Sequence, residues 1–187
     1  MKNRLAEKEA YRRPRSHPVP GLESGSGLKL EKSVTINRPR EEIFAFWRSF
    51  ENLPRFMKHI ESVTETAPGF SHWVIRTEKG KSLEWDARII EERPPEMLSW
   101  VSLPGADVDN AGSVWFTPEP GGRGTVVKVQ LKYSPPGGKL AAMIAKLLGD
   151  SADEQIAADL FRLKSLLESG EAPTAAGQPH GNPGSER

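Results

Sequence analysis

The chain has 187 residues, 36% of them hydrophobic, a net charge of +1 and no cysteine, and this length suffices for one domain with its own core. The lack of cysteine excludes disulfide bonds, thiolate nucleophiles and cysteine-based metal sites. No stretch approaches the roughly 18 apolar residues that cross a bilayer, and the N-terminus has no apolar signal segment. We therefore expect a cytoplasmic protein with no transmembrane segment.

The two ends differ in composition from the middle. Residues 1–27 carry the basic excess together with several prolines and a Ser-Gly run, and 170–187 consist largely of Gly, Pro, Ala and Ser. We predict a disordered basic tail over 1–27, a folded domain over 28–169 and a disordered tail over 170–187. The folded part is not basic, which argues against a specific nucleic-acid partner. The basic tail leaves room only for weak contact with a membrane surface or a protein.

The first elements expected are a strand and two short helices. Residues 28–36 alternate apolar and polar side chains, with one slip at Lys32, which predicts a strand. Pro39 then stands at a position typical of a helix start, and two glutamates follow where they suit the helix dipole. Apolar residues recur at helical spacing as far as Phe50. A second short helix is predicted over 52–57.

The middle of the chain shows repeated strand and turn signals. Six further strands are predicted, at 60–66, 70–77, 83–89, 97–103, 112–117 and 124–133. The clearest runs from Leu83 to Ile89, because its apolar residues alternate with charged ones. Such alternation is typical of an antiparallel sheet with one face in water.

Four of the five tryptophans lie one to a strand in this region. They are Trp73, Trp85, Trp100 and Trp115. A tryptophan buries a large apolar area, so we predict a sheet with one aromatic-rich face. Trp115 is ambiguous, since Val114 and Phe116 compete for the same face.

A helical region is expected after the last strand, ending near Ser169. Its apolar residues form two stripes separated by Gly149-Asp150, where we expect a kink or break. Gly170 is typical of a helix C-terminus. This is the long helix available to cover the aromatic face. A sheet curved around one long helix can hold an apolar ligand between them.

Four segments carry a resemblance to a known family. They are Val34–Phe44, Phe50–Met57, Trp85–Ile89 with Trp100 after it, and Asp159–Lys164 with Glu168–Glu171. With the order of elements, they resemble the START/Bet v 1-like (SRPBCC) superfamily, including its polyketide cyclase/dehydrase and coenzyme Q-binding families. The resemblance covers 29–170. It implies an α+β helix-grip fold, in which a curved antiparallel sheet of about seven strands surrounds a long C-terminal helix and a cavity. It implies no catalytic set that transfers residue by residue.

The candidate ligand-binding residues follow from the expected aromatic face and the covering helix. They are Trp47, Val74, Trp85, Ala87, Trp100, Val129, Leu131, Tyr133, Met143, Leu147 and Leu160. His72 and Arg76 are candidates for the cavity mouth, where they would orient a polar headgroup. The alternative for His72 is a histidine on the solvent side of its strand. The alternative for the tryptophans is that they are ordinary core residues. In this fold the core wall and the cavity wall are one surface, so both interpretations of the tryptophans can hold.

Catalytic and metal signals are few. The four histidines have no metal-ligand spacing, so we expect no metal and no cofactor. No nucleophile elbow is present, and Gly121–Gly124 lacks the Lys-Ser/Thr of a phosphate loop. Tyr133 is the single candidate for a general acid, because its strand position can direct its hydroxyl inward. Its alternative role is that of a core or rim tyrosine.

Three functions are therefore open. The first is binding or transport of a hydrophobic small molecule of the lipid, isoprenoid or quinone class. The second is a protein-interaction module that uses the same fold. The third is a cyclase or dehydratase acting on a polyketide-like substrate in the same cavity.

Overall fold

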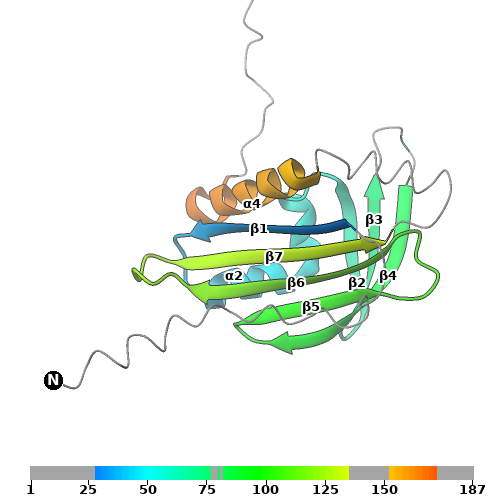
Figure 1. Cartoon of the computed structure of the whole chain (residues 1–187), viewed down its shortest axis with the longest axis horizontal. Helices are drawn as coiled ribbons and strands as arrows, with labels where there is room; N and C mark the ends of the chain where they lie inside the picture. Colours follow the sequence, from blue (N-terminus) through cyan, green and yellow to red (C-terminus); the bar gives the residue numbers. More distant parts are fainter. Residues whose placement is uncertain (1–27, 77–79, 81, 135–151, 172–187) are drawn as a thin grey trace, which may run out of the picture.

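The computed structural model describes residues 28–76, 80, 82–134 and 152–171, which form one antiparallel sheet and three helical segments (Figure 1). The seven strands are ordered β1-β7-β6-β5-β4-β3-β2. The elements in chain order are β1 Leu28–Ile36, α2 Arg40–Arg48, the 3₁₀ helix η1 Phe50–Arg55, β2 Ile60–Ala67, β3 Phe70–Arg76, β4 Ser82–Arg93, β5 Met97–Ser102, β6 Asp109–Pro118, β7 Thr125–Ser134 and α4 Ala152–Ser169. This is the predicted helix-grip fold.

The sheet curves around the helices. Figure 1 shows α4 running alongside β1, while α2 and η1 lie behind the strands. The buried core joins α2 and η1 to the inner face of the sheet and to Leu160 and Leu163 of α4. The side chains that α4 buries therefore face the same apolar space as the inner face of the sheet.

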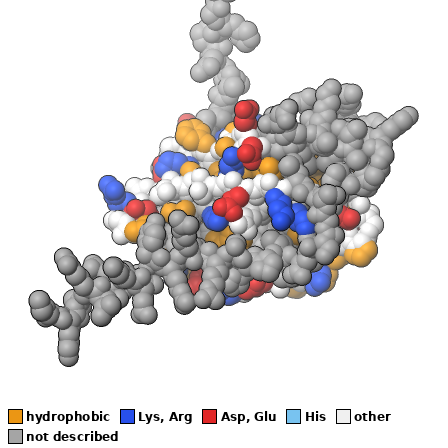
Figure 2. Space-filling model, in the orientation of Figure 1, with side chains coloured by type: hydrophobic (Ala, Val, Ile, Leu, Met, Phe, Trp, Pro, Cys, Tyr) orange, Lys and Arg blue, Asp and Glu red, His pale blue; other side chains and the backbone are white. Residues whose placement is uncertain are grey.

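The outer face of the sheet carries paired charges. Where described side chains are visible over β1 and β7, acidic and basic groups lie next to one another (Figure 2). Lys128 Nζ, for example, lies 2.7 Å from Glu31 Oε1 of the neighbouring strand. At β1 and β7 this is the wet face that the alternation predicts, whereas Met97, Ser99, Ala111 and Ser113 on the outer side of β5 and β6 are buried.

Lys32, the one polar residue that interrupts the apolar alternation, does not interrupt the strand. β1 pairs with β7 in unbroken register, and Lys32 lies opposite Val129 on the inner side. A charged side chain is tolerated there because β1 is an edge strand and Lys32 Nζ reaches Asp153 Oδ2 of α4 at 2.9 Å. The lysine thus ties the first turn of α4 to the sheet.

The largest differences from the predicted bounds are in three elements, and most of the other strands differ by one residue. β6 begins at Asp109 because its ladder with β7 continues to Ser134. β4 continues to Arg93 past a register shift between Ile89 and Glu91. The second short helix is the 3₁₀ segment η1, which contains Pro54, a residue with no N–H to donate.

Backbone and side-chain hydrogen bonds fix the C-terminal end of α4. Arg38 Nε donates to the carbonyl of Leu167 at 2.8 Å, and the Asn37 N–H donates to Glu168 Oε1 at 2.7 Å. Gly170 has φ +80° and donates its N–H to the carbonyl of Leu166, as predicted for a helix end. The predicted helical stripe before residue 152, with Met143 and Leu147, lies outside the described residues. No helix in the described ranges has the length and apolar character to span a membrane.

Candidate functional site

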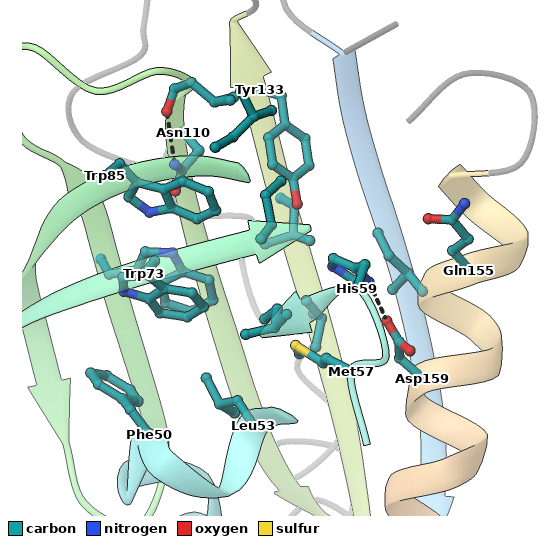
Figure 3. Close-up of a pocket in the computed structure, with 18 of the residues that line it drawn as sticks. Phe50, Leu53, Met57, His59, Trp73, Trp85, Asn110, Tyr133, Gln155 and Asp159 are labelled. Atoms are coloured by element: carbon teal, nitrogen blue, oxygen red, sulfur yellow. Dashed lines mark hydrogen bonds and ion pairs between the residues drawn. The ribbon is translucent and has the colours of Figure 1, made fainter. Parts of the chain in front are cut away.

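A cavity of about 80 Å³ lies between the inner face of the sheet and α4 (Figure 3). Its sheet wall is mainly aromatic and aliphatic, and η1 closes one side with Phe50 and Leu53. Ile156 and Leu160 of α4 contribute the facing apolar side chains. This is the arrangement that the sequence predicts for an apolar ligand.

Three tryptophans from consecutive strands form the sheet wall. Trp73 lies opposite Trp85 in the β3–β4 ladder, and both rings point inward. The Trp73 ring centroid is 5.8 Å from that of Trp85 at an interplanar angle of 14°, and 6.3 Å from that of Trp100 at 16°. The Trp73 ring stacks with each of the other two rings, and we call the three rings together the tryptophan wall.

The tryptophan wall requires a glycine on the next strand. Gly112 of β6 pairs with Trp100 of β5. A Cβ at Gly112 would lie 2.2 Å from Cζ2 of the Trp100 ring, far inside van der Waals contact. The ring therefore occupies the space that a side chain at residue 112 would fill.

Trp73 and Trp85 differ in whether the indole N–H has a hydrogen-bond acceptor. Trp73 Nε1 donates to Ser71 Oγ at 2.9 Å. Trp85 Nε1 is buried and finds no acceptor within the described parts of the chain. An unpaired buried donor costs about 1–3 kcal/mol, so an oxygen acceptor on a bound molecule would relieve this cost.

A polar cluster lies where the pocket meets α4. The Asp159 carboxylate is almost fully buried, with its side chain 3% exposed, and its Oδ2 lies 3.5 Å from His59 Nδ1. Its Oδ1 accepts a hydrogen bond from Arg162, whose Nε donates to the carbonyl of Phe56 at 2.8 Å. The cluster joins α4 to the segment between η1 and β2.

Burial sets the protonation behaviour of this cluster. It raises the pKa of Asp159 above 3.8, against the opposing effects of His59 and Arg162. It lowers the pKa of His59 below 6.5, and the charge of Arg162 acts in the same direction while Asp159 opposes it. Burial, and then the charge of Asp159, raises the pKa of Tyr133. At pH 7 the site therefore holds a neutral imidazole and a protonated phenol.

Most of the candidate ligand-binding residues line the cavity. Those that do are Trp47, Trp85, Trp100, Val129, Leu131, Tyr133 and Leu160. Ala87 is fully buried in the core and does not line the cavity. Met143 and Leu147 lie outside the described residues.

The structure corrects two candidates on β3. Because Ser71 and Trp73 alternate inward, Val74 and His72 face the other side of the sheet, where His72 Nδ1 lies 2.9 Å from Asp86 Oδ1. Neither lines the cavity. Arg76 does reach its edge, but its Nε donates to Glu61 Oε2 at 2.9 Å. Trp115 also faces outward, since Val114 and Phe116 take the core side of β6.

The sequence interpretation missed the polar part of the site. His59 and Asp159 both line the cavity, as do Trp73 and Asn110. Asp159 follows Ile156 by three residues and precedes Leu163 by four, which places it on the apolar stripe of α4. From that spacing, Asp159 could have been predicted to face the cavity. Among the described residues, no group of three His, Cys, Asp or Glu is arranged to hold a metal ion.

Comparison with known proteins agrees with this geometry. A family model described as polyketide cyclase/dehydrase and lipid transport matches residues 36–161. A crystal structure from Deinococcus radiodurans is 34% identical, with a TM-score of 0.63, and the match covers 76% of this chain and 98% of that one.

Two more distant structures share the fold alone. The Zhui aromatase/cyclase from Streptomyces sp. R1128 is 13% identical, with a TM-score of 0.58 over 78% of this chain and 98% of that chain. A START superfamily protein from Mycobacterium smegmatis is 18% identical, with a TM-score of 0.58 over 75% and 99%.

Proposed function

Because the chain belongs to the polyketide cyclase/dehydrase and lipid transport family, we propose that it binds and carries a hydrophobic small molecule of the lipid, isoprenoid or quinone class. The observation that carries this proposal is the tryptophan wall, which faces α4 across a cavity. An aromatic wall favours apolar groups, because it offers them contact area without polar competition.

The size of the cavity bears on how such a ligand would sit. A single water needs about 10–15 Å³ of such volume, so 80 Å³ accommodates only a small part of a drug-sized molecule. A longer ligand must extend out of the cavity or displace the side chains that α4 contributes. The C-terminal end of α4 is held by Arg38 and Asn37, whereas the cavity is lined by its first half, through Ile156, Asp159 and Leu160. We therefore include in the proposal that the ligand enters the cavity past the first half of α4.

Native mass spectrometry of the purified full-length chain, followed by analysis of its organic extract, tests the proposal. We expect a stoichiometric apolar molecule on the wild type, and its loss in Trp85→Ala. Trp115→Ala is the matched control, since it removes a tryptophan from the outer face of the same sheet. Equal ligand content in all three proteins, or a wild type that neither carries nor takes up an apolar molecule, contradicts the proposal.

A second candidate function is a cyclase or dehydratase acting on a polyketide-like substrate. The observation in its favour is Tyr133, which lines the apolar cavity together with His59 and Asp159. A phenol whose pKa burial raises remains a proton donor across the neutral range. For this function we expect Tyr133→Phe to lower the turnover of a cyclising substrate strongly while ligand binding is retained. Full turnover in Tyr133→Phe would remove Tyr133 from that role.

A further inference from the structure

We propose that His59 and Asp159 form a proton-accepting site in this cavity, and that the ligand class is an apolar molecule with a weakly acidic proton, on a hydroxyl group or on a carbon beside a carbonyl. This inference rests on the proposed function, because it concerns the same cavity. It adds a reaction that the cavity can perform on what it binds. His59 is the residue that takes the proton, and Asp159 is a positioning residue.

The surroundings of Asp159 fix which of its oxygens meets the imidazole. Arg162 donates to Oδ1, and this leaves Oδ2 to face His59 Nδ1 at 3.5 Å. A carboxylate beside Nδ1 favours the tautomer that carries its hydrogen there, so the lone pair is on Nε2. Figure 3 shows the second ring nitrogen of His59 turned away from Asp159, toward the cavity. The 3.5 Å separation is long for a hydrogen bond, and such contacts in free enzymes tighten when a ligand binds.

Charged and titratable groups surround His59 on every packed element. Asp159 and Arg162 approach from α4, and Tyr133 lines the same cavity from β7. Arg76 of β3 donates its backbone N–H to the His59 carbonyl, and its guanidinium is paired with Glu61. Burial is the largest influence, and it lowers the pKa of His59. The imidazole is therefore neutral at pH 7 and free to accept a proton.

Tyr133 supplies the complementary donor. Its hydroxyl points into the cavity from the β7 side in Figure 3. Because burial raises the pKa of Tyr133, the phenol keeps its proton. It is placed to donate a hydrogen bond to a ligand oxygen on which negative charge develops. The apolar walls strengthen such an interaction, because they keep water away.

The chain contains a matched pair of the same type outside the cavity. His72 Nδ1 lies 2.9 Å from Asp86 Oδ1 on the outer face of the sheet, and neither residue lines the cavity. If an imidazole beside a carboxylate were sufficient, this outer pair would act as well. The proposal requires that only the pair in the cavity does so.

The Kemp elimination of 5-nitrobenzisoxazole by the full-length protein tests the proposal with a defined probe. His59 Nε2 takes the proton from C3, the C–H electrons complete the nitrile, and the N–O bond breaks onto the oxygen to give a coloured cyanophenolate. We expect a saturable rate that falls at least about tenfold in His59→Gln, in line with general-base catalysis. His72→Gln should leave the rate unchanged. Asp159→Asn should lower it, and added imidazole should restore part of the rate of His59→Ala.

The pH profile gives a readout that a purely structural role would not move. The rate should be level around pH 7 and fall as the pH drops through the pKa of His59, which lies below 6.5. A wild-type rate that simply rises with hydroxide concentration would overturn the proposal, even if His59→Gln failed to fold.

Tryptophan fluorescence quenching by the same probe separates the two levels of inference. Saturable quenching with equal rates in wild type and His59→Gln overturns the proton-accepting site and leaves the proposed binding function intact. Absence of saturable quenching overturns both.

Discussion

Gly112 lies directly opposite Trp100 in the β5–β6 ladder, and the Trp100 ring lies where a Cβ of residue 112 would be, 2.2 Å from the position that atom would take. The ring thus rests on the bare backbone of the neighbouring strand. This brings it into the near-parallel arrangement with Trp73. One residue without a side chain therefore decides where one third of the tryptophan wall sits.

Gly112→Ala should displace the Trp100 ring. Overpacking of this kind costs about 1–3 kcal/mol, measured as a lower free energy of unfolding in urea. Trp100→Phe in the Gly112→Ala background should recover part of the loss, because a smaller ring leaves room for the methyl group. Additive effects of the two changes would mean that their contact is not the cause.

The indole N–H of Trp85, which has no acceptor among the described residues, should make the cavity prefer a ketone to the matching hydrocarbon. We expect the wild type to bind 9-fluorenone about 3–10-fold more tightly than fluorene, the value of one neutral hydrogen bond. The ratio should approach one in Trp85→Phe and persist in Trp100→Phe, as measured by fluorescence titration. A ratio that survives in Trp85→Phe would show that another group recognises the carbonyl.

Glu168 should contribute stability that depends on pH. Its hydrogen bond from the Asn37 N–H, followed by that from Lys164, lowers its pKa below 4.5. A lowered folded-state pKa means that the contribution is present above 4.5 and is lost as the pH falls through the folded value. Glu168→Gln should therefore cost about 0.5–1 kcal/mol at pH 7 and nothing in strongly acid solution. Glu171→Gln is the control, and an equal cost at both pH values would refute the assignment.

Arg162 should be needed for stability, because it pairs with the buried charge of Asp159. Arg162→Met removes a partner of a carboxylate that is 3% exposed and should cost about 3–5 kcal/mol. Adding Asp159→Asn should restore part of this stability, because the unpaired charge is gone. Thermal and urea unfolding of both variants measure the effect. A double variant no more stable than Arg162→Met would indicate that packing of the Arg162 stem dominates.

The strands, the order of elements and the aromatic face could be predicted from local patterns. Period-two alternation and turn residues mark each strand, so even the inward face from Leu83 to Ala87 is readable. Side chains that depend on distant partners were not readable. Lys32 looked like an irregularity because its partner Asp153 is 121 residues away.

The candidate site divides in the same way. Its apolar half follows from the alternation of apolar and polar residues. The prediction turned His72 and Val74 of β3 toward the cavity, whereas the structure turns Trp73 inward, opposite Trp85. Its polar half depends on the packing of α4 against the segment after η1, which brings Asp159 to His59. No local pattern encodes that approach. The directions in which the pKa values of Asp159 and His59 shift follow from this burial and approach, and cannot be predicted from the residue types alone.

The most direct test of an apolar ligand on the tryptophan wall is a titration of the full-length chain with 9-fluorenone, followed through the five indole N–H signals by ¹⁵N NMR. We predict saturable shifts for Trp73, Trp85 and Trp100 and an unmoved signal for Trp115, which faces away from the cavity. Unmoved signals for the first three, or a shift confined to Trp115, would contradict the account.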